Sequence, residues 1–310
     1  MSVYGPSGAS LDSGLHLSAL LPNDPGFVPH DASLALRLDG TAVGWVMAWI
    51  HQAPCFDGNS QVWLRVHLDP DLAGTVLEQM MVTLLNELVH RVVTDGDGRP
   101  TWVRVEIDAK QDWLRDLLPT SGFQHTRTFL TMEHPVALPS HPSTTVTALV
   151  PDEMPLETQL RTPSNADREM IRRAHNDAFQ DHWGSGQVGV HRWQAMYEGT
   201  SETAPISNHL SRVMAAADGS IAAYALVTKP KSKVAMVSVM GTRRAYRRQG
   251  LGRILLTHCL AAAAQEPELK TLRVDVDSQS AAHRLYISVG FEPRESNLIF
   301  EKLMPAAVRT

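Results

Sequence analysis

The sequence contains few cysteines, no long apolar run and no excess of positive charge. Its 310 residues include two cysteines, Cys55 and Cys259, which are too few for a disulfide framework and favour a reducing compartment. The longest apolar run, 41–50, is shorter than a membrane-spanning helix. A formal net charge of -5 at pH 7 gives no general attraction to nucleic acid or to anionic membranes. The sequence therefore predicts a cytoplasmic protein with neither of these partners.

Metal ligands and targeting signals are also scarce. The 14 histidines show no paired spacing of the kind that holds zinc, so no metal is expected. Residues 1–14 have neither a basic start nor an apolar core, which predicts a mobile leader rather than a signal peptide. The length is sufficient for two domains that each bury a core.

The strongest functional pattern lies in residues 235–252, AMVSVMGTRRAYRRQGLG. The stretch begins as an apolar strand, passes through a basic turn and ends in Gly250-x-Gly252 at the start of an amphipathic helix. Glycine lacks the Cβ atom that would keep a phosphate from the backbone, and the first amides of a helix carry positive partial charge. Three arginines surround the turn: Arg247, Arg248 and Arg253. The pattern predicts a phosphate-binding loop, with a solvated basic turn as the alternative.

The residues after this loop continue an α/β pattern. The helix that follows, from Arg253 on, has one apolar face and can lie on a sheet. Residues 271–277 alternate as a strand, residues 280–289 form a second helix that Gly290 ends, and a last strand starts at Phe291.

This order of elements and two motifs resemble the acetyl-CoA core of the GCN5-related N-acetyltransferases (GNAT). The motifs are Arg-x-x-Gly-x-Gly at 247–252 and LYISVGF at 285–291, and the resemblance covers roughly the last 150 residues. It implies direct transfer of an acetyl group from acetyl-CoA to an amine, without a covalent enzyme intermediate.

The resemblance also implies roles for individual residues. Amides of the turn hold the pyrophosphate, the strand around Gly241 holds the pantetheine arm and the acetyl carbonyl, and Tyr286 protonates the leaving thiolate. Gln279 stands where the family usually has an asparagine that bonds the pantetheine, which departs from the family pattern. The expected acetyl-CoA contacts are Met240, Gly241, Thr242, Arg247, Arg248, Gln249, Gly250, Leu251, Gly252, Arg253, Gln279 and Tyr286.

The acceptor side is expected to form from the loop Asp181-His182-Trp183 and the helix at 190–198, which cover the acceptor in the GNAT fold. His182 is a candidate base, although a histidine in a loop more often bonds the backbone. Asp275 lies on the strand face opposite the apolar residues, and this position suits either solvent or the acceptor cleft.

The first half of the chain repeats this order of elements. A hairpin at 33–50 and a strand at 61–68 precede a helix at 75–93 and a strand at 101–108. The motif LLPTSGF at 117–123 then echoes the later one. The chain therefore resembles a tandem GNAT protein, a layout shared with mycothiol synthases and several antibiotic-modifying acetyltransferases.

The first repeat lacks the residues that the chemistry needs. Ala73, Val76 and Glu78 stand at the positions of the arginine and the two glycines of the phosphate loop, and Leu118 replaces the tyrosine. Side chains and a carboxylate at these positions would exclude a pyrophosphate. The predicted divisions are a structural, degenerate GNAT-like domain at 1–138, a proline-rich linker at 139–154 and a catalytic domain at 155–310.

The predicted fold class is α/β (α+β in some schemes), with two tandem GNAT-like domains that each contain a mixed, mostly antiparallel sheet flanked by helices. The predicted function is an acetyl-CoA-dependent N-acetyltransferase that acts on a small-molecule amine, because a covering first domain suggests an enclosed cleft. A CoA-binding sensor or scaffold without transferase activity is the alternative, since residues 233–242 contain no glutamate or histidine. Neither the acceptor amine nor the oligomeric state follows from the sequence.

Overall fold

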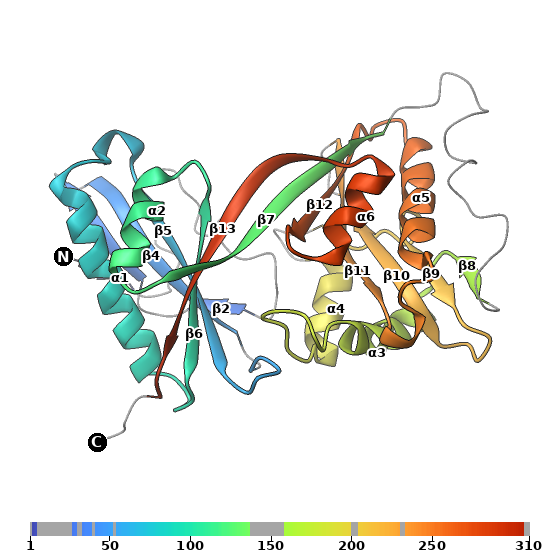
Figure 1. Ribbon diagram of the computed structural model, residues 1–310, viewed down its shortest axis with the longest axis horizontal. Coiled ribbons are helices and arrows are strands. Elements are labelled where there is room, and N and C mark those ends of the chain that lie inside the picture. Colours follow the sequence, from blue (N-terminus) through green and yellow to red (C-terminus); the bar gives the residue numbers. More distant parts are fainter. Residues whose placement is uncertain are drawn as a thin grey trace. The chain divides into compact units, whose positions relative to one another are not determined.

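The chain forms two compact units, each described separately (Figure 1). The computed structural model describes residues 2–4, 27–29, 33–38, 41–51, 54–136, 158–199, 204–229 and 233–306. The first unit comprises Met1–Phe129 with Ser296–Thr310, and the second comprises Leu130–Glu295. The linker expected at 139–154 lies outside the described residues.

The first unit contains the strands and helices that its sequence pattern predicts and three short elements, β1, β2 and η2, that the sequence did not predict. Its elements are β1 (Ser2–Tyr4), β2 (Phe27–Pro29), β3 (Ser33–Leu38), β4 (Thr41–His51), β5 (Ser60–Leu68), η2 (Pro70–Leu72), α1 (Val76–Thr94), β6 (Thr101–Asp108) and α2 (Asp112–Thr120). β5 and β6 run parallel across α1, whereas β3, β4 and β5 pair antiparallel. The prediction of a mobile leader is wrong for β1, because these three residues pair with β3.

The core of the first unit lies between its sheet and α1. Val62, Leu64 and Val66 alternate along β5 and share a buried cluster with Leu84 and Leu88 of α1. Alternation with period two on the strand and helical spacing on α1 therefore place both apolar faces against each other.

The second unit contains the elements expected of the predicted catalytic half. They are β8 (Gln159–Arg161), η4 (Asn165–Asp167), α3 (Arg168–Ala178), α4 (Val190–Glu198), β9 (Arg212–Ala215), β10 (Ile221–Thr228), β11 (Val234–Thr242), η5 (Arg244–Tyr246), α5 (Leu251–Ala264), β12 (Thr271–Asp277) and α6 (Ala281–Val289). The strands β8 to β11 pair antiparallel in sequence order, and β11 and β12 run parallel. Both units are thus mixed, mostly antiparallel sheets with helices, and the predicted fold class is confirmed.

Two long strands, β7 (Gln124–Pro135) and β13 (Glu292–Met304), each contribute to both units. In the first unit the strand order is β1-β3-β4-β5-β6-β13-β7, and residues Asn297–Met304 of β13 pair antiparallel with β6. In the second unit β12 is followed by β7. The contiguous division at 155–310 expected from the sequence therefore differs at the C-terminal strand, whose end completes the sheet of the first unit.

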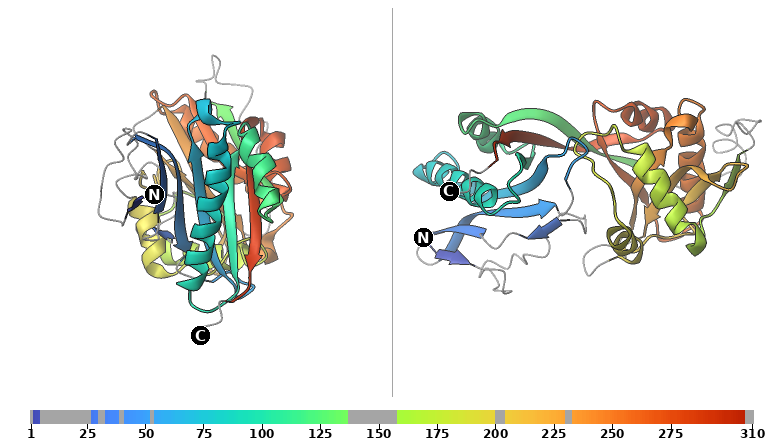
Figure 2. Two further views of the ribbon diagram at one scale, coloured as in Figure 1. Left: turned by 90° about the vertical axis from the view of Figure 1, so that its left-hand side faces the viewer. Right: turned by 90° about the horizontal axis from the view of Figure 1, so that it is seen from below.

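The sheet of the second unit carries a different core on each face (Figure 2). Ala223 and Ala225 of β10 pack in a cluster with α5 and α6. Tyr224 and Leu226, which alternate with these alanines along the strand, lie on the other face and pack in a cluster with α3 and α4. The strand is therefore buried on both faces, which is why β10 is apolar along its whole length. In the described part of the chain, no helix has the length and apolar character needed to cross a membrane.

Candidate functional site

β11 and β12 pair over only part of their length. The parallel register joins residues 234–236 to residues 271–273, while β11 continues to Thr242. On its other edge β11 stays paired with β10, as far as Thr242 opposite Ala223. β11 therefore separates from β12 after Met236 and leaves one edge open.

The register also sets the direction of the backbone groups on the open edge. The Arg243 N–H donates to Ala222 O at 2.9 Å, so Gly241 and Tyr224 form the next hydrogen-bonded pair of the antiparallel ladder. Met240 is one residue away, and its N–H and C=O point to the opposite side, where β12 has separated. An unpaired strand amide at this point can bind a carbonyl oxygen.

The phosphate loop, which we define as residues 247–253, leads into α5 through two left-handed residues. Arg248 has a φ of 66° and Gly250 a φ of 78°. For an L-residue such as Arg248 this conformation costs about 1–2 kcal/mol. In residues 233–306, the five consecutive backbone N–H groups from Arg248 to Gly252 donate to no protein acceptor. Free amides at a helix N-terminus, in a turn of this type, form an anion-binding concavity.

Glycine is required at the two glycine positions of the loop for different structural reasons. A Cβ built on Gly250 would meet nothing within 4 Å, and the residue is required instead by its positive φ. A Cβ on Gly252 would lie 2.9 Å from Leu285 Cδ2 and 3.2 Å from Met240 Cε. Gly252 therefore allows α5 to pack closely on Leu285 and Met240. This is a second role for the glycine, besides the close approach of a phosphate expected from the sequence.

The three arginines of the loop differ in what they contact. Arg247 donates to both carboxylate oxygens of Asp181, at 2.8 and 2.9 Å. Arg253 donates to Ser288 Oγ at 2.8 Å. Arg248 is exposed and makes no side-chain hydrogen bond within the described residues. Two of the three guanidinium groups thus bind the protein itself, and only that of Arg248 makes no such bond within the described residues.

The loop also contains one buried polar atom without a partner. Gln249 Oε1 accepts no hydrogen bond within the described chain, and its Nε2 lies 3.5 Å from Ala245 O. Leu251, at the first turn of α5, is buried in the core and anchors the loop to the sheet. Packing of Leu251 in the core therefore holds the loop in place, while the backbone N–H groups of residues 248–252 remain free to bind a ligand.

Tyr286 lies on α6 with its ring in the core of the second unit. Its side chain is 4% exposed, and the ring packs edge-on against Phe291 at 5.5 Å. Gly290 ends the helix in the left-handed conformation, with a φ of 98°, so that Phe291 can return onto the tyrosine. Burial raises the pKa of the Tyr286 phenol well above its ordinary value. The hydroxyl therefore keeps its proton at neutral pH.

His182 lies in the loop that follows α3. Its Nδ1 is 3.1 Å from Trp183 O, and its ring packs on Phe179 at 5.2 Å. Because a carbonyl oxygen only accepts, Nδ1 carries the proton in the neutral ring and Nε2 keeps its lone pair. The neighbouring Asp181 is bound to Arg247 and so reaches the phosphate loop.

The other predicted residues of the site lie on β12 and after it. The Asp275 carboxylate accepts a hydrogen bond from Thr131 Oγ1 of β7 at 2.7 Å and is exposed. The Gln279 N–H donates to Asp277 Oδ1 at 2.9 Å, in the turn before α6. The described residues hold no group of three or more His, Cys, Asp or Glu arranged for a metal ion.

A buried histidine–tyrosine pair was not found from the sequence. His175 Nδ1 lies 2.7 Å from Tyr224 Oη, and the imidazole stacks on Phe179 at 4.4 Å. Tyr224 is fully buried, and burial raises its pKa well above the ordinary value. A Cβ on Gly241 would lie 2.7 Å from Tyr224 Oη, so this glycine makes room for the phenol. The register between β10 and β11 brings Gly241 to Tyr224, and the packing of α3 on the sheet brings His175 to it; the sequence contains no signal for either contact.

The Tyr224→Phe variant tests this pair. It removes a buried hydroxyl and its bond to His175 while keeping the ring, so the free energy of unfolding is expected to fall by about 1 kcal/mol. Urea denaturation measures the change. Tyr246→Phe, on a half-exposed tyrosine of η5, is the matched control and should change stability little. Equal stability of Tyr224→Phe and the wild type would contradict a structural role for the bond.

The comparisons with known proteins agree with this geometry. Residues 168–291 match the profile of the acetyltransferase (GNAT) family. A GCN5-related N-acetyltransferase from Sphaerobacter thermophilus has a TM-score of 0.67 at 17% identity, over 96% of this chain and 85% of that one. A tandem GNAT protein from the clavulanic acid biosynthesis pathway has a TM-score of 0.60 at 14% identity, over 92% and 86% of the two chains. The search of curated protein sequences returned no match. The similarity to a tandem GNAT fold predicted from the sequence is thus confirmed.

Proposed function

We propose that this protein transfers the acetyl group of acetyl-CoA to the amine of a small molecule, a proposal supported by the match of residues 168–291 to the acetyltransferase (GNAT) family. The observation that carries the proposal is the run of five free backbone N–H groups from Arg248 to Gly252 at the start of α5. Nothing in the described chain accepts these hydrogen bonds, and a pyrophosphate would satisfy them.

The residues around the loop fit a CoA thioester in shape and charge. No Cβ lies over Gly250, the exposed Arg248 adds a cation beside the amides, and the open edge of β11 ends at Thr242, five residues before the loop begins at Arg247. Acetyl-CoA, when bound, supplies an activated acetyl group. The Met240 N–H, on the open edge, would donate to the carbonyl oxygen as that oxygen gains negative charge.

Two side chains supply the proton transfers in this proposal. An amine attacks only as the neutral base, so its proton must first pass to an acceptor. The Nε2 lone pair of His182 supports this role, because its Nδ1 is already committed to Trp183 O. The new C–N bond forms as the C–S bond breaks, and the neutral phenol of Tyr286 gives its proton to the sulfur. Cys259 has a pKa raised to about 12 by burial, which is unsuitable for a nucleophile.

The direct test is an assay with acetyl-CoA and a panel of small amines that follows release of the free thiol. Thiol release that depends on one class of amine is expected, and mass spectrometry of the product identifies the acceptor. Binding of acetyl-CoA without thiol release, across metabolite extracts as well as the panel, would favour the alternative of a CoA-binding sensor or scaffold.

The proposal also predicts one CoA site per chain. In the first unit the corresponding turn leads into α1, where the Thr75 side chain accepts from Leu77 N–H at 3.3 Å and Glu78 Oε1 accepts from Gly74 N–H at 2.6 Å. The N–H groups of Gly74 and Leu77 at this helix start thus already donate to side-chain oxygens of the protein, and the Glu78 carboxylate would repel a phosphate.

Calorimetry with CoA is therefore expected to give a stoichiometry of one. The Glu78→Gln variant is a useful control, because it removes the repelling charge of the first unit but leaves the phosphate loop intact. A stoichiometry of two for the wild type would contradict the assignment of the first unit to a structural role.

A further inference from the structure

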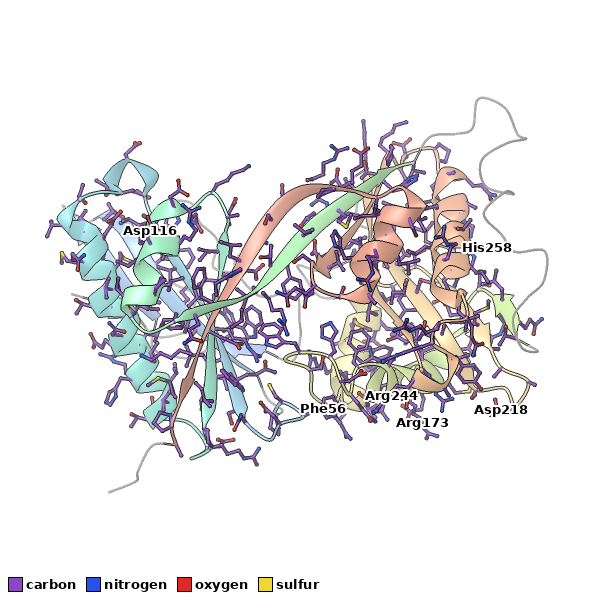
Figure 3. The ribbon with its side chains drawn as sticks, in the orientation of Figure 1. Phe56, Asp116, Arg173, Asp218, Arg244 and His258 are labelled. Atoms are coloured by element: carbon purple, nitrogen blue, oxygen red, sulfur yellow. The ribbon has the colours of Figure 1, made fainter. Side chains whose placement is uncertain are left out.

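Hydrogen bonds join the phosphate loop to the C-terminal end of α3 and to the residues that follow it. Arg247 donates four hydrogen bonds: three go to the α3 side, to Asp181 Oδ1 and Oδ2 and to Ala178 O at 2.8 Å, and one goes to Thr242 O at the end of β11, at 3.4 Å. Nearby, Arg244, labelled in Figure 3, donates its backbone N–H to Asp177 Oδ2 at 3.1 Å. Most of the donors of Arg247 are thus used by the protein, and they point to α3 and the loop after it.

The Asp181–Arg247 pair has the geometry of a bidentate fork. Two parallel N–H···O bonds fix the direction of both side chains, in addition to their attraction. The hydrogen bonds from Arg247 lower the pKa of Asp181 to about 2, so the carboxylate is charged throughout the neutral range. The side chains of Arg247 and Asp181 are 38% and 53% exposed. Solvent screening therefore weakens the attraction between the two charges, but it does not change the geometry of the fork.

Asp181 is the third residue of the loop between α3 and α4, which we call the acceptor loop and define as residues 179–189. The next residue is His182, whose ring is fixed by Trp183 O and Phe179. Arg247 is the residue directly before the free amides of the phosphate loop. One ion pair therefore joins the last residue before the phosphate-binding amides to the residue before the candidate base.

We propose that Asp181 is a positioning residue that couples the phosphate loop to the acceptor loop. When acetyl-CoA binds the phosphate loop it restricts the motion of Arg247, and Arg247 in turn restricts the acceptor loop through its ion pair with Asp181. The proposal rests on acetyl-CoA as the cosubstrate. Acetyl-CoA bound at residues 248–252 restricts the adjacent backbone of Arg247, and the bidentate fork carries this restriction to Asp181 and His182. By linkage, an acceptor that fixes the acceptor loop strengthens acetyl-CoA binding by the same factor.

Hydrogen exchange of the acceptor loop tests this coupling without knowledge of the acceptor. In the wild type, saturating acetyl-CoA is expected to slow amide exchange in residues 179–189 by about fivefold, the size of effect that an exposed ion pair supports. Asp181→Asn removes the charge and keeps the shape of the side chain. This variant is expected to bind acetyl-CoA with an affinity within about fivefold of the wild type but to lose the slowing.

The same helix offers a matched control. Glu169 on α3 also accepts a fork, from Nε and Nη2 of Arg172 at 2.8 Å each, and it binds Arg173 at 2.9 Å; these bonds lower its pKa to about 2. Glu169→Gln removes ion pairs that do not contact the phosphate loop and leaves the bond from Arg172 to Val188 O of the acceptor loop available, so the slowing by acetyl-CoA should persist. Arg247→Lys is a second test of the tie, because lysine keeps the charge but cannot form the fork. It should lose most of the slowing.

Slowing of the same size in wild type, Asp181→Asn and Arg247→Lys would overturn the coupling while leaving acetyl-CoA binding intact. Loss of slowing in Glu169→Gln as well would also overturn it, because any ion pair of α3 would then have the effect. Calorimetry separates these results from a failure of the proposed function. Absence of acetyl-CoA binding to the wild type would overturn both, whereas binding without any change in the acceptor loop overturns the coupling alone.

Discussion

The Gly250→Val variant is expected to lose acetyl-CoA affinity by at least about 100-fold while it stays folded. Gly250 has a φ of 78°, which a β-branched residue adopts only with strain, so valine would turn the flanking amides away from their present directions. Loss of two hydrogen bonds to a charged phosphate, at about 1.5–3 kcal/mol each, accounts for the expected decrease. Because a Cβ here meets no atom within 4 Å, the core is not disturbed.

Gly219→Val is the matched control for this variant. Gly219 has a φ of 79°, lies in the β9–β10 turn beside Asp218 (Figure 3), and would also meet nothing within 4 Å. Valine should therefore cause similar backbone strain at both positions, about 1–2 kcal/mol of unfolding free energy. Calorimetry with acetyl-CoA and urea denaturation of both variants separate binding from stability. A folded Gly250→Val protein with wild-type affinity would mean that the loop is only a turn.

Local signals in the sequence predicted most of the secondary structure. The strand Thr271–Asp277 and the helix Val190–Glu198 have the bounds expected from alternation and helical spacing. Ser280 caps α6 by accepting from His283 N–H, and Gly290 ends it. These features depend on residues within a few positions of one another, which is why the sequence alone contains them.

Contacts between distant segments could not be predicted in this way. The end of β13 pairs with β6, almost two hundred residues earlier in the chain, and nothing in residues 297–304 distinguishes one neighbouring strand from another. Gly252 was expected to serve a phosphate, but the structure adds close packing on Leu285, which requires the position of α6. Arg247 was expected to add charge to the loop, and its fork with Asp181 depends on where α3 ends.

The same distinction applies to the candidate site. Sequence motifs pointed to the candidate phosphate loop and to Tyr286, because close backbone approach and a tyrosine before a Gly-Phe pair follow from residue types at fixed spacing. His175 was taken only as part of an apolar helix face, and its bond to Tyr224 was missed. The roles of the predicted contact residues remain predictions, since they concern atoms of a substrate rather than of the chain.

Replacement of Tyr286 by phenylalanine separates the chemical step from binding. Phenylalanine keeps the ring against Phe291 and its place in the core, so the fold and the affinity for acetyl-CoA should persist. The proton donor for the sulfur is lost. General acid catalysis contributes about 10²- to 10⁴-fold, and a thiolate leaves readily as the anion, so we expect a decrease in kcat of about 100-fold.

The decrease should lie in kcat rather than in the KM for acetyl-CoA, because the proton is needed only as the C–S bond breaks. Burial raises the pKa of Tyr286 well above its ordinary value, so the wild-type phenol stays protonated and the difference between the two proteins should be constant through neutral and mildly alkaline pH. Tyr246→Phe, on a partly buried tyrosine at the edge of the core, controls for loss of a hydroxyl near the loop. Full kcat in Tyr286→Phe would assign the tyrosine to packing, and the proton of the thiol would then have to come from water or from the acceptor side.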